Sequence, residues 1–168
     1  MKPGYRQAII CSNTEIATNI YEMKVTFTQN DKSKCHPETD RMSFADEGFN
    51  YLGFPGQFYM LKSWELDPFL PRPISIANIE DDMIIFLYEV RGKGTDVFSK
   101  LKSGDTLELL GPLGNGFDLE KVANKTSLCH IAIISGGIGI APMIYLAKEL
   151  QGNIDFYCGF RDEVYYID

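Results

Sequence analysis

The first two thirds of the chain alternates hydrophobic and polar residues in short runs. Between Tyr21 and Phe27, apolar side chains alternate with Glu22, Lys24 and Thr26. Turn-forming residues separate the runs, and such a regular series of short strands predicts an antiparallel barrel or sandwich. The expected strands are Ala8–Ile10, residues 21–27, Gln57–Leu61, Ile74–Ala77, Met83–Val90 and Thr106–Leu110.

One short helix is expected within this series of strands. Thr95 is its predicted N-cap, and Gly104 follows its end. Val97, Phe98 and Leu101 recur at helical spacing and form its predicted buried face.

The pattern changes near residue 118. The continuous apolar run Ile131–Ile134 predicts a buried strand, and Ile154–Cys158 predicts a second one. Between them, apolar residues recur at helical spacing: Ile140, Met143, Ile144, Ala147 and Leu150. This order is the opening of a parallel α/β unit. The predicted fold is therefore an antiparallel Greek-key barrel over residues 1–118, followed by an incomplete parallel α/β domain over residues 119–168.

Residues 29–53 fit neither pattern. They are polar, charged and rich in turn formers, which predicts a long exposed loop within the barrel domain. Loops of this length are usually functional or mobile, and solvated mobility is the favoured interpretation.

The turn between the Ile131–Ile134 strand and the helix is rich in glycine. Gly136, Gly137 and Gly139 precede Pro142, which suits a first helical turn. Glycine lets the backbone approach a ligand, and free amides at a helix N-terminus attract phosphate. The turn therefore predicts binding of a dinucleotide phosphate. The alternative is a turn that only packs the helix closely on the sheet.

A membrane span in this region is disfavoured, although no charged residue lies between Lys125 and Lys148. The glycines and the proline interrupt the stretch, and its apolar period changes from continuous to helical at Gly136.

Composition narrows the classes of function. The chain has 168 residues, 45% of them hydrophobic, which is ample for a buried core. Its net charge is −7, with 16 Lys and Arg against 23 Asp and Glu. This balance disfavours nucleic-acid binding, which requires a basic face.

The cysteines indicate a reduced, cytoplasmic compartment. Cys11, Cys35, Cys129 and Cys158 are widely dispersed, and the N-terminus lacks the apolar core of a signal peptide. No pair has metal-ligand spacing, and the neighbouring Cys35 and His36 are taken as incidental. No metal site is expected.

Two further segments have the chemistry of anion sites. Residues 72–75 (Arg-Pro-Ile-Ser) place a cation, a rigid residue and a hydroxyl at the start of a strand. Residues 91–95 (Arg-Gly-Lys-Gly-Thr) open the short helix with glycine-freed amides and a hydroxyl. Either segment alone is as consistent with a surface turn, but two anion sites in one barrel suggest a pyrophosphate.

With these motifs in order, the chain resembles the ferredoxin-reductase-like flavoproteins and, among them, the electron transfer subunits of dihydroorotate dehydrogenases. The matching segments are Pro55–Phe58, Arg72–Ser75, Gly92–Thr95, Leu109–Phe117 and Gly136–Pro142. The resemblance implies an FAD-binding barrel and a nicotinamide domain. It also implies hydride transfer from NADH to the flavin and release of single electrons to a next carrier.

The resemblance also assigns residues to cofactor binding. Arg72 would contact the phosphate or ribitol side of FAD, and Ser75 would lie near the reactive edge of the isoalloxazine. The full set is Arg72, Pro73, Ile74, Ser75, Leu87, Tyr88, Glu89, Gly94 and Thr95 for FAD, and Gly136, Gly137 and Gly139 for the dinucleotide. Leu87 and Tyr88 could instead be ordinary barrel residues. No side chain is assigned as a catalytic acid or base.

The family normally continues into the rest of the nicotinamide domain and a cysteine cluster that holds a two-iron two-sulfur centre. The four dispersed cysteines here cannot supply such a cluster, and the NAD(H) site is incomplete, so we expect a truncated form. The expected partner is the catalytic dihydroorotate dehydrogenase subunit, in a hetero-oligomer. The alternatives are a flavin subunit of another NAD(P)H-linked complex, such as a sulfide dehydrogenase or a ferredoxin:NADP oxidoreductase, and a catalytically silent docking module.

Overall fold

The computed structural model describes residues 5–28, 52–119, 121, 130–150 and 154–167. The predicted loop at residues 29–53 lies outside this description except for its last two residues.

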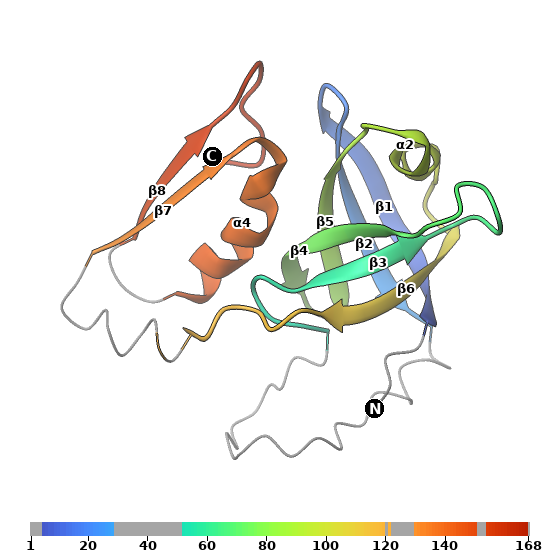
Figure 1. The fold of residues 1–168 in the computed structure, drawn as a ribbon, viewed down its shortest axis with the longest axis horizontal. Helices are drawn as coiled ribbons and strands as arrows, with labels where there is room; N and C mark the ends of the chain where they lie inside the picture. Colours follow the sequence, from blue (N-terminus) through green and yellow to red (C-terminus); the bar gives the residue numbers. More distant parts are fainter. Residues whose placement is uncertain (1–4, 29–51, 120, 122–129, 151–153, 168) are drawn as a thin grey trace, which may run out of the picture.

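Six antiparallel strands form a closed barrel (Figure 1). Their order around the barrel is β1-β2-β5-β4-β3-β6, and β6 pairs with β1 to close it. The consecutive strands β3, β4 and β5 lie side by side. Strand β2 pairs with the edge of β5 that faces away from β4, which is a Greek-key order. The strands are β1 (Tyr5–Ala17), β2 (Ile20–Phe27), β3 (Phe58–Lys62), β4 (Arg72–Glu80), β5 (Met83–Glu89) and β6 (Thr106–Leu113).

The barrel is filled by the inward-facing side chains of every strand, as the alternating pattern requires. Aromatic rings dominate its centre: Tyr59 meets Phe86 edge to face, with ring centroids 5.9 Å apart. Strand β5 departs from alternation because Ile84–Tyr88 are all buried. One face of this strand meets the barrel interior, and the other is covered by a helix described below.

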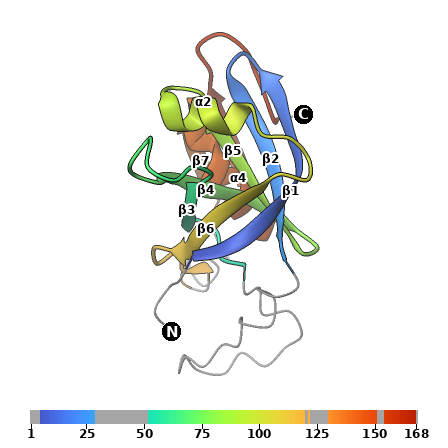
Figure 2. The ribbon, with the colours of Figure 1, turned by 90° about the vertical axis from the view of Figure 1, so that its right-hand side faces the viewer.

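Helix α2 (Lys93–Ser99) lies over one end of the barrel (Figure 2). Phe98 is fully buried and meets Tyr88 edge to face at 5.9 Å, so the helix plugs the barrel with an aromatic ring. The predicted N-cap was wrong, because the helix begins at Lys93 with Gly92 as N-cap. The Thr95 hydroxyl instead bonds back to the main chain, accepting from the amides of Arg91 and Gly92 and donating to the Gly92 carbonyl.

Asn13 of β1 joins this helix to the barrel. Its side-chain amide donates to the carbonyls of Phe98 and Leu101, each at 2.9 Å, and so satisfies carbonyls at the C-terminal end of α2. Its carbonyl oxygen accepts from the Tyr88 hydroxyl at 3.0 Å. One side chain therefore fixes the helix to both β1 and β5.

The second unit is a parallel pair of strands with one helix. Strand β7 (Ile131–Gly136) pairs with β8 (Ile154–Gly159) in register from Ile131 opposite Ile154 to Gly136 opposite Gly159. Between them lie the short 3-10 helix η1 (Gly137–Gly139) and helix α4 (Ile140–Glu149). The predicted fold class, a barrel followed by part of an α/β unit, is confirmed.

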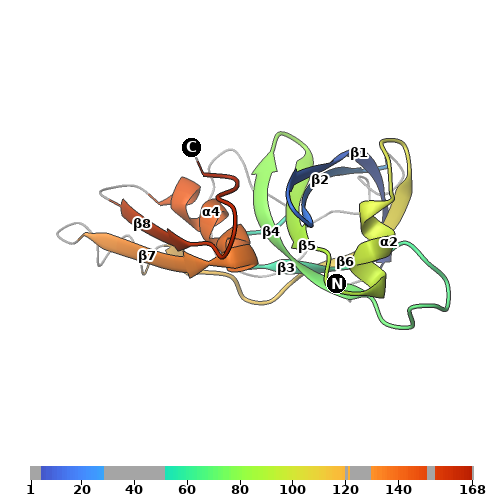
Figure 3. The same ribbon diagram turned by 90° about the horizontal axis from the view of Figure 1, so that it is seen from above.

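Helix α4 lies between the barrel and the β7–β8 sheet (Figure 3). Ile140, Ala141 and Ile144 pack with Ala77 of β4 and Leu87 of β5. A second row on the helix, Leu146 and Leu150 together with Met143 and Ala147, packs against Ile133 of β7. The predicted apolar stripe thus divides between two partners, and the alanine at 141 is buried against the barrel as well.

Strand β7, helix η1 and α4 up to Lys148 belong to the uncharged stretch that was considered as a membrane span. Among the residues that the structure describes, no helix combines the length and apolar character that a membrane span needs.

Removing the Asn13 side chain should destabilise the barrel. In Asn13→Ala, the Tyr88 hydroxyl and the Leu101 carbonyl lose this partner, and the Phe98 carbonyl keeps only its main-chain donors. We expect this loss to cost about 1–3 kcal/mol in the free energy of unfolding. Urea denaturation followed by circular dichroism measures this change. Thr14→Ala, at the exposed neighbouring position, is the control and should change stability by no more than about 0.5 kcal/mol. Equal effects of the two substitutions would contradict this role of Asn13.

Candidate functional site

Arg72, at the start of β4, packs against the N-terminal turn of α2. A Cβ atom added at Gly94 would lie 2.6 Å from Arg72 Nε and 3.0 Å from Trp64 Cη2. The Arg72 guanidinium lies over the Trp64 ring, 5.7 Å from its centroid, and donates to the Leu70 carbonyl at 2.7 Å. The tertiary structure thus brings together the two predicted anion-binding segments, which are about 20 residues apart in sequence.

The polar groups near this arginine differ in whether they already have a hydrogen-bond or ion-pair partner. Those of Arg91 and Gly92 are occupied by the Thr95 hydroxyl. The Lys93 side chain pairs with Asp67 in the segment between β3 and β4. Two polar atoms in that segment, Ser63 Oγ and Trp64 Nε1, are buried without a hydrogen-bond partner. Buried polar atoms usually have partners, so this pair is consistent with a ligand-binding surface.

The other predicted residues of β4 divide between the two faces of the strand. Ile74 is buried in the barrel core, whereas Pro73 is exposed and Ser75 is half-buried. Ala77, on the same face as Ser75, packs against α4. Ser75 therefore lies on the outer face of the barrel, on the side where α4 packs.

The predicted residues of β5 are placed differently. Leu87 is buried between the barrel and α4, and Tyr88 stacks on Tyr21 inside the barrel, with ring centroids 5.5 Å apart. Burial raises the pKa of the Tyr88 hydroxyl. At the end of the strand, the Glu89 carboxylate pairs with Arg91 at 2.7 Å and raises the pKa of that guanidinium. Of these three residues, Glu89 lines a cavity beside the end of β5, and Leu87 and Tyr88 do not line it.

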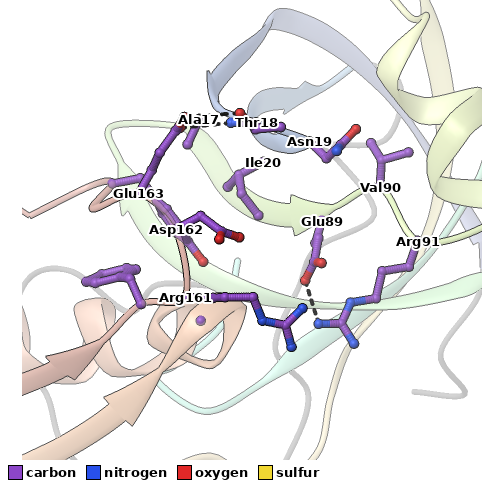
Figure 4. Close-up of a pocket in the computed structure, with 13 residues that line it drawn as sticks. Ala17, Thr18, Asn19, Ile20, Glu89, Val90, Arg91, Arg161, Asp162 and Glu163 are labelled. Carbon is purple, nitrogen blue, oxygen red and sulfur yellow. Dashed lines mark hydrogen bonds and ion pairs between the residues drawn. The ribbon is translucent and has the colours of Figure 1, made fainter.

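That cavity is a pocket of about 620 Å³ between the barrel and the segment that follows β8 (Figure 4). Its walls are the β1–β2 turn (Ala17–Ile20), the end of β5 (Glu89–Arg91), Gly137 and residues Phe160–Glu163 with Tyr165. Arg72 and Ser75 do not line it. The segment 91–95 connects the two places, because Arg91 lines the pocket while Thr95 belongs to α2.

Gly137 is the member of the glycine-rich turn that lines this pocket. Its φ angle is +52°, a conformation that favours glycine, and an added Cβ would meet no atom within 4 Å. Gly136 and Gly139 are part of the same turn, and an added Cβ at either would make only ordinary contacts, at 3.5 Å or more. The turn therefore presents open backbone toward the pocket rather than packing closely against the sheet.

The segment after β8 is tied to the barrel on the far side of the pocket. Both carboxylate oxygens of Glu163 accept hydrogen bonds from Thr18, one from its amide and one from its hydroxyl, each at 3.1 Å. Phe160 meets Tyr165 edge to face at 4.8 Å, and Tyr165 is buried with α4 and the barrel. Burial, with the Glu89 charge nearby, raises the pKa of the Tyr165 hydroxyl.

Arg161 is a pocket residue to which the sequence patterns gave no role, whereas Arg91 was expected only as part of the anion-binding segment 91–95. Arg161 could have been noticed from its position directly after a predicted parallel strand, because ligands bind at the carboxyl ends of such strands. Within the described ranges, no group of three or more His, Cys, Asp and Glu side chains is arranged to hold a metal ion. Burial raises the pKa of the Cys158 thiol, which packs beside α4 as a small core residue.

Comparison with solved structures shows which proteins share this fold. The structure of the NADH-dependent reduced ferredoxin-NADP oxidoreductase matches with a TM-score of 0.67 at 24% identity, over 92% of this chain and 49% of that one. Ferredoxin-NADP+ reductase from Plasmodium falciparum gives a TM-score of 0.70 at 15% identity, over 96% and 62%. Phthalate dioxygenase reductase gives 0.65 at 21% identity, over 95% and 44%. The fold is therefore that of the ferredoxin-reductase-like proteins.

Sequence comparison shows which proteins are related to this chain. No family model matches the chain. The electron transfer subunit of dihydroorotate dehydrogenase B (NAD(+)) from Clostridium acetobutylicum is 55% identical over 108 residues, which are 64% of this chain and 42% of that protein. The same subunit from Listeria monocytogenes serotype 4a is 40% identical over 158 residues, 90% of this chain and 53% of that protein.

A third relative, from Caldanaerobacter subterraneus subsp. tengcongensis, is 36% identical over 163 residues, 96% of this chain and 55% of that protein. The chain is thus a homologue of the dihydroorotate dehydrogenase B electron transfer subunits, and the resemblance noted from its motifs is confirmed. It spans about half the length of the curated relatives it matches.

A methyl group at Gly94 should displace Arg72. In Gly94→Ala, the new Cβ would fall within 3.0 Å of both the guanidinium and the Trp64 ring, so these side chains must move. Since Trp64 is the one tryptophan of the chain, its fluorescence emission reports the change directly. Gly92→Ala is the matched control, because an added Cβ there meets nothing within 4 Å. Identical spectra for the two variants would show that the close packing at Gly94 is unimportant.

Proposed function

We propose that this chain is an FAD-binding electron transfer module and that Arg72 is its main contact with the FAD phosphates. The observation that carries the proposal is the packing of Arg72 against Gly94, which joins the two anion-binding segments in one place. A guanidinium binds phosphate through two parallel hydrogen bonds, and close approach of a phosphate to the helix N-terminus requires small residues there. Pro73, Ile74 and Thr95 would hold these groups in place.

A second feature that fits FAD is a pair of buried polar atoms without hydrogen-bond partners. Ser63 Oγ and Trp64 Nε1 are buried next to this region without partners, so they can bind polar ligand atoms. On the outer face of β4 and β5, Ser75 and Glu89 would bound the isoalloxazine beside the main chain of Tyr88, whereas Leu87 is covered by α4. When bound, FAD can accept two electrons from a nicotinamide and release them one at a time.

We infer that the dinucleotide approaches through the turn at Gly136, Gly137 and Gly139. Support comes from the open backbone at Gly137 and from the position of the turn at the carboxyl end of β7, where α/β folds bind nucleotides. In this arrangement the chain's residues would orient the two cofactors, and we assign no side chain as a catalytic acid or base. The barrel, residues 1–118, would carry the flavin and residues 119–168 would supply part of the nicotinamide site.

The proposed partner is a catalytic dihydroorotate dehydrogenase subunit in a cytoplasmic hetero-oligomer. It is supported by the name shared by the curated relatives, the electron transfer subunit of that enzyme. Electrons would pass from NADH through the flavin to an iron-sulfur centre and on to this subunit. The four cysteines of this sequence lack the close spacing that ligands of such a centre have.

Replacing Arg72 should release the flavin. In Arg72→Gln, the phosphates lose a charged bidentate partner worth about 1.5–3 kcal/mol, so FAD affinity should fall by about 10- to 150-fold. The measurement is the flavin absorbance retained after purification, followed by titration of the apoprotein with FAD. Lys102→Gln removes one positive charge from the exposed turn after α2 and is the control. A wild-type protein that neither contains nor takes up FAD would refute the proposed function, and equal affinity of both variants would refute the role of Arg72.

A further inference from the structure

Arg161 is a cation without a partner in the pocket. Within the residues that the structure describes, its guanidinium makes no hydrogen bond or ion pair. The other arginine of the pocket, Arg91, is held by Glu89 at 2.7 Å. A solvated surface arginine without a partner is ordinary, but this one lines a cavity.

The charges of the pocket are separated along its length. Figure 4 shows Arg161 directed toward the end where Glu89 and Arg91 lie, Glu163 directed toward Thr18 of the β1–β2 turn, and Asp162 directed into the pocket. Both carboxylate oxygens of Glu163 are occupied by Thr18, and Arg91 offsets Glu89. At the end near β5, the charges of Arg91 and Glu89 offset each other, so Arg161 adds a guanidinium there that is not paired with a carboxylate.

The backbone that carries Arg161 is held at both ends. On one side it continues from β8, which is paired with β7 up to Gly159. On the other, Glu163 is bonded to Thr18, and Tyr165 is buried. Because the backbone is anchored, binding a ligand requires ordering of the Arg161 side chain but little ordering of the main chain.

Gly137 lines the same pocket and leads into α4. The helix N-terminus carries partial positive charge, and the open backbone at Gly137 allows an anion to approach it. Positive groups from β8 and from the glycine-rich turn therefore converge on one cavity. A volume of about 620 Å³ lies within the range of pockets that hold small-molecule ligands.

We propose that Arg161 binds the diphosphate bridge of the nicotinamide dinucleotide. This inference rests on the proposed function and adds to it a residue that no motif had assigned. The diphosphate carries two negative charges and matches the fork geometry of a guanidinium, while Gly137 gives it access to the helix amides. Arg91 remains bound to Glu89 and borders the same end.

The test is equilibrium binding of ADP-ribose, which contains the diphosphate but no nicotinamide. Isothermal titration calorimetry of the purified, flavin-loaded protein should show binding that weakens about tenfold or more in Arg161→Gln. Arg161→Lys keeps the charge without the fork and should give an intermediate affinity. Lys121→Gln is the control, because Lys121 is exposed, pairs with Asp118 and lies outside the pocket. Absence of binding to the wild type, or equal affinity of wild type and Arg161→Gln, would overturn the proposal.

A second measurement separates this proposal from the proposed function. Flavin content and the rate of flavin bleaching by 1-benzyl-1,4-dihydronicotinamide, a donor without phosphate, should be the same in wild type and Arg161→Gln. With NADH, the substitution should raise the concentration needed for half-maximal bleaching. If the variant is impaired equally with both donors, Arg161 acts on the flavin or the fold and the diphosphate assignment fails. Missing flavin in the wild type would instead refute the function proposed for the barrel.

Discussion

The burial of α4 on two sides is the interaction on which the arrangement of this protein depends. One row of its side chains completes the outer surface of the barrel at Ala77 and Leu87, and another covers the β7–β8 sheet. A helix buried on both sides cannot shift toward one partner without exposing apolar surface at the other. Gly137, which precedes this helix, is therefore held at a constant place relative to the end of β5. The pocket between Gly137 and Glu89 follows from that constraint.

The opposite end of the barrel depends on α2 in a similar way. Phe98 fills the barrel mouth and Asn13 satisfies carbonyls at the end of the helix, so the N-terminal turn of α2 is brought beside Arg72. The segment Arg91–Thr95 then links this turn to the pocket, with Arg91 in the pocket wall and the Thr95 hydroxyl bonded to the amides of Arg91 and Gly92. The candidate FAD contact and the candidate dinucleotide pocket are thus joined by five residues of main chain.

Local charge matters more here than net charge. The chain carries −7 overall, which favours solubility and disfavours nucleic acid. Arg72 and Arg161 nevertheless stand at two separate places, one beside the turn of α2 and the other at the end of β8. Anionic cofactors are recognised by such local groups, since interactions over more than about 10 Å are largely screened at physiological salt. An acidic protein can therefore bind anionic ligands in places where its own carboxylates are already occupied.

The sequence by itself determined the elements and the kinds of chemistry. Alternation in Tyr21–Phe27, the apolar run Ile131–Ile134 and the helical spacing from Ile140 are local properties, because strand and helix periods are set by neighbouring residues along the chain. Glycine and arginine motifs likewise indicated anion binding, since backbone access and charge belong to the residue type. The prediction of Thr95 as the N-cap of α2 was wrong because both Gly92 and Thr95 can begin a helix. Hydrogen bonds from main-chain amides to the Thr95 hydroxyl favour the earlier start at Gly92.

Only the tertiary structure decided which residues meet. Contact between Arg72 and Gly94 depends on α2 being fixed over the barrel, and the division of the α4 stripe depends on two surfaces that are distant in sequence. The same holds for the roles of Leu87 and Tyr88, whose side chains are buried because α4 and α2 cover the strand on both sides. The sequence alone did not single out Arg161, because an arginine after a strand is common. In the structure, the hydrogen bonds between Thr18 and Glu163 hold its segment beside a pocket. Periodicity records the neighbours of a residue along the chain, whereas a site depends on long-range packing that periodicity does not contain.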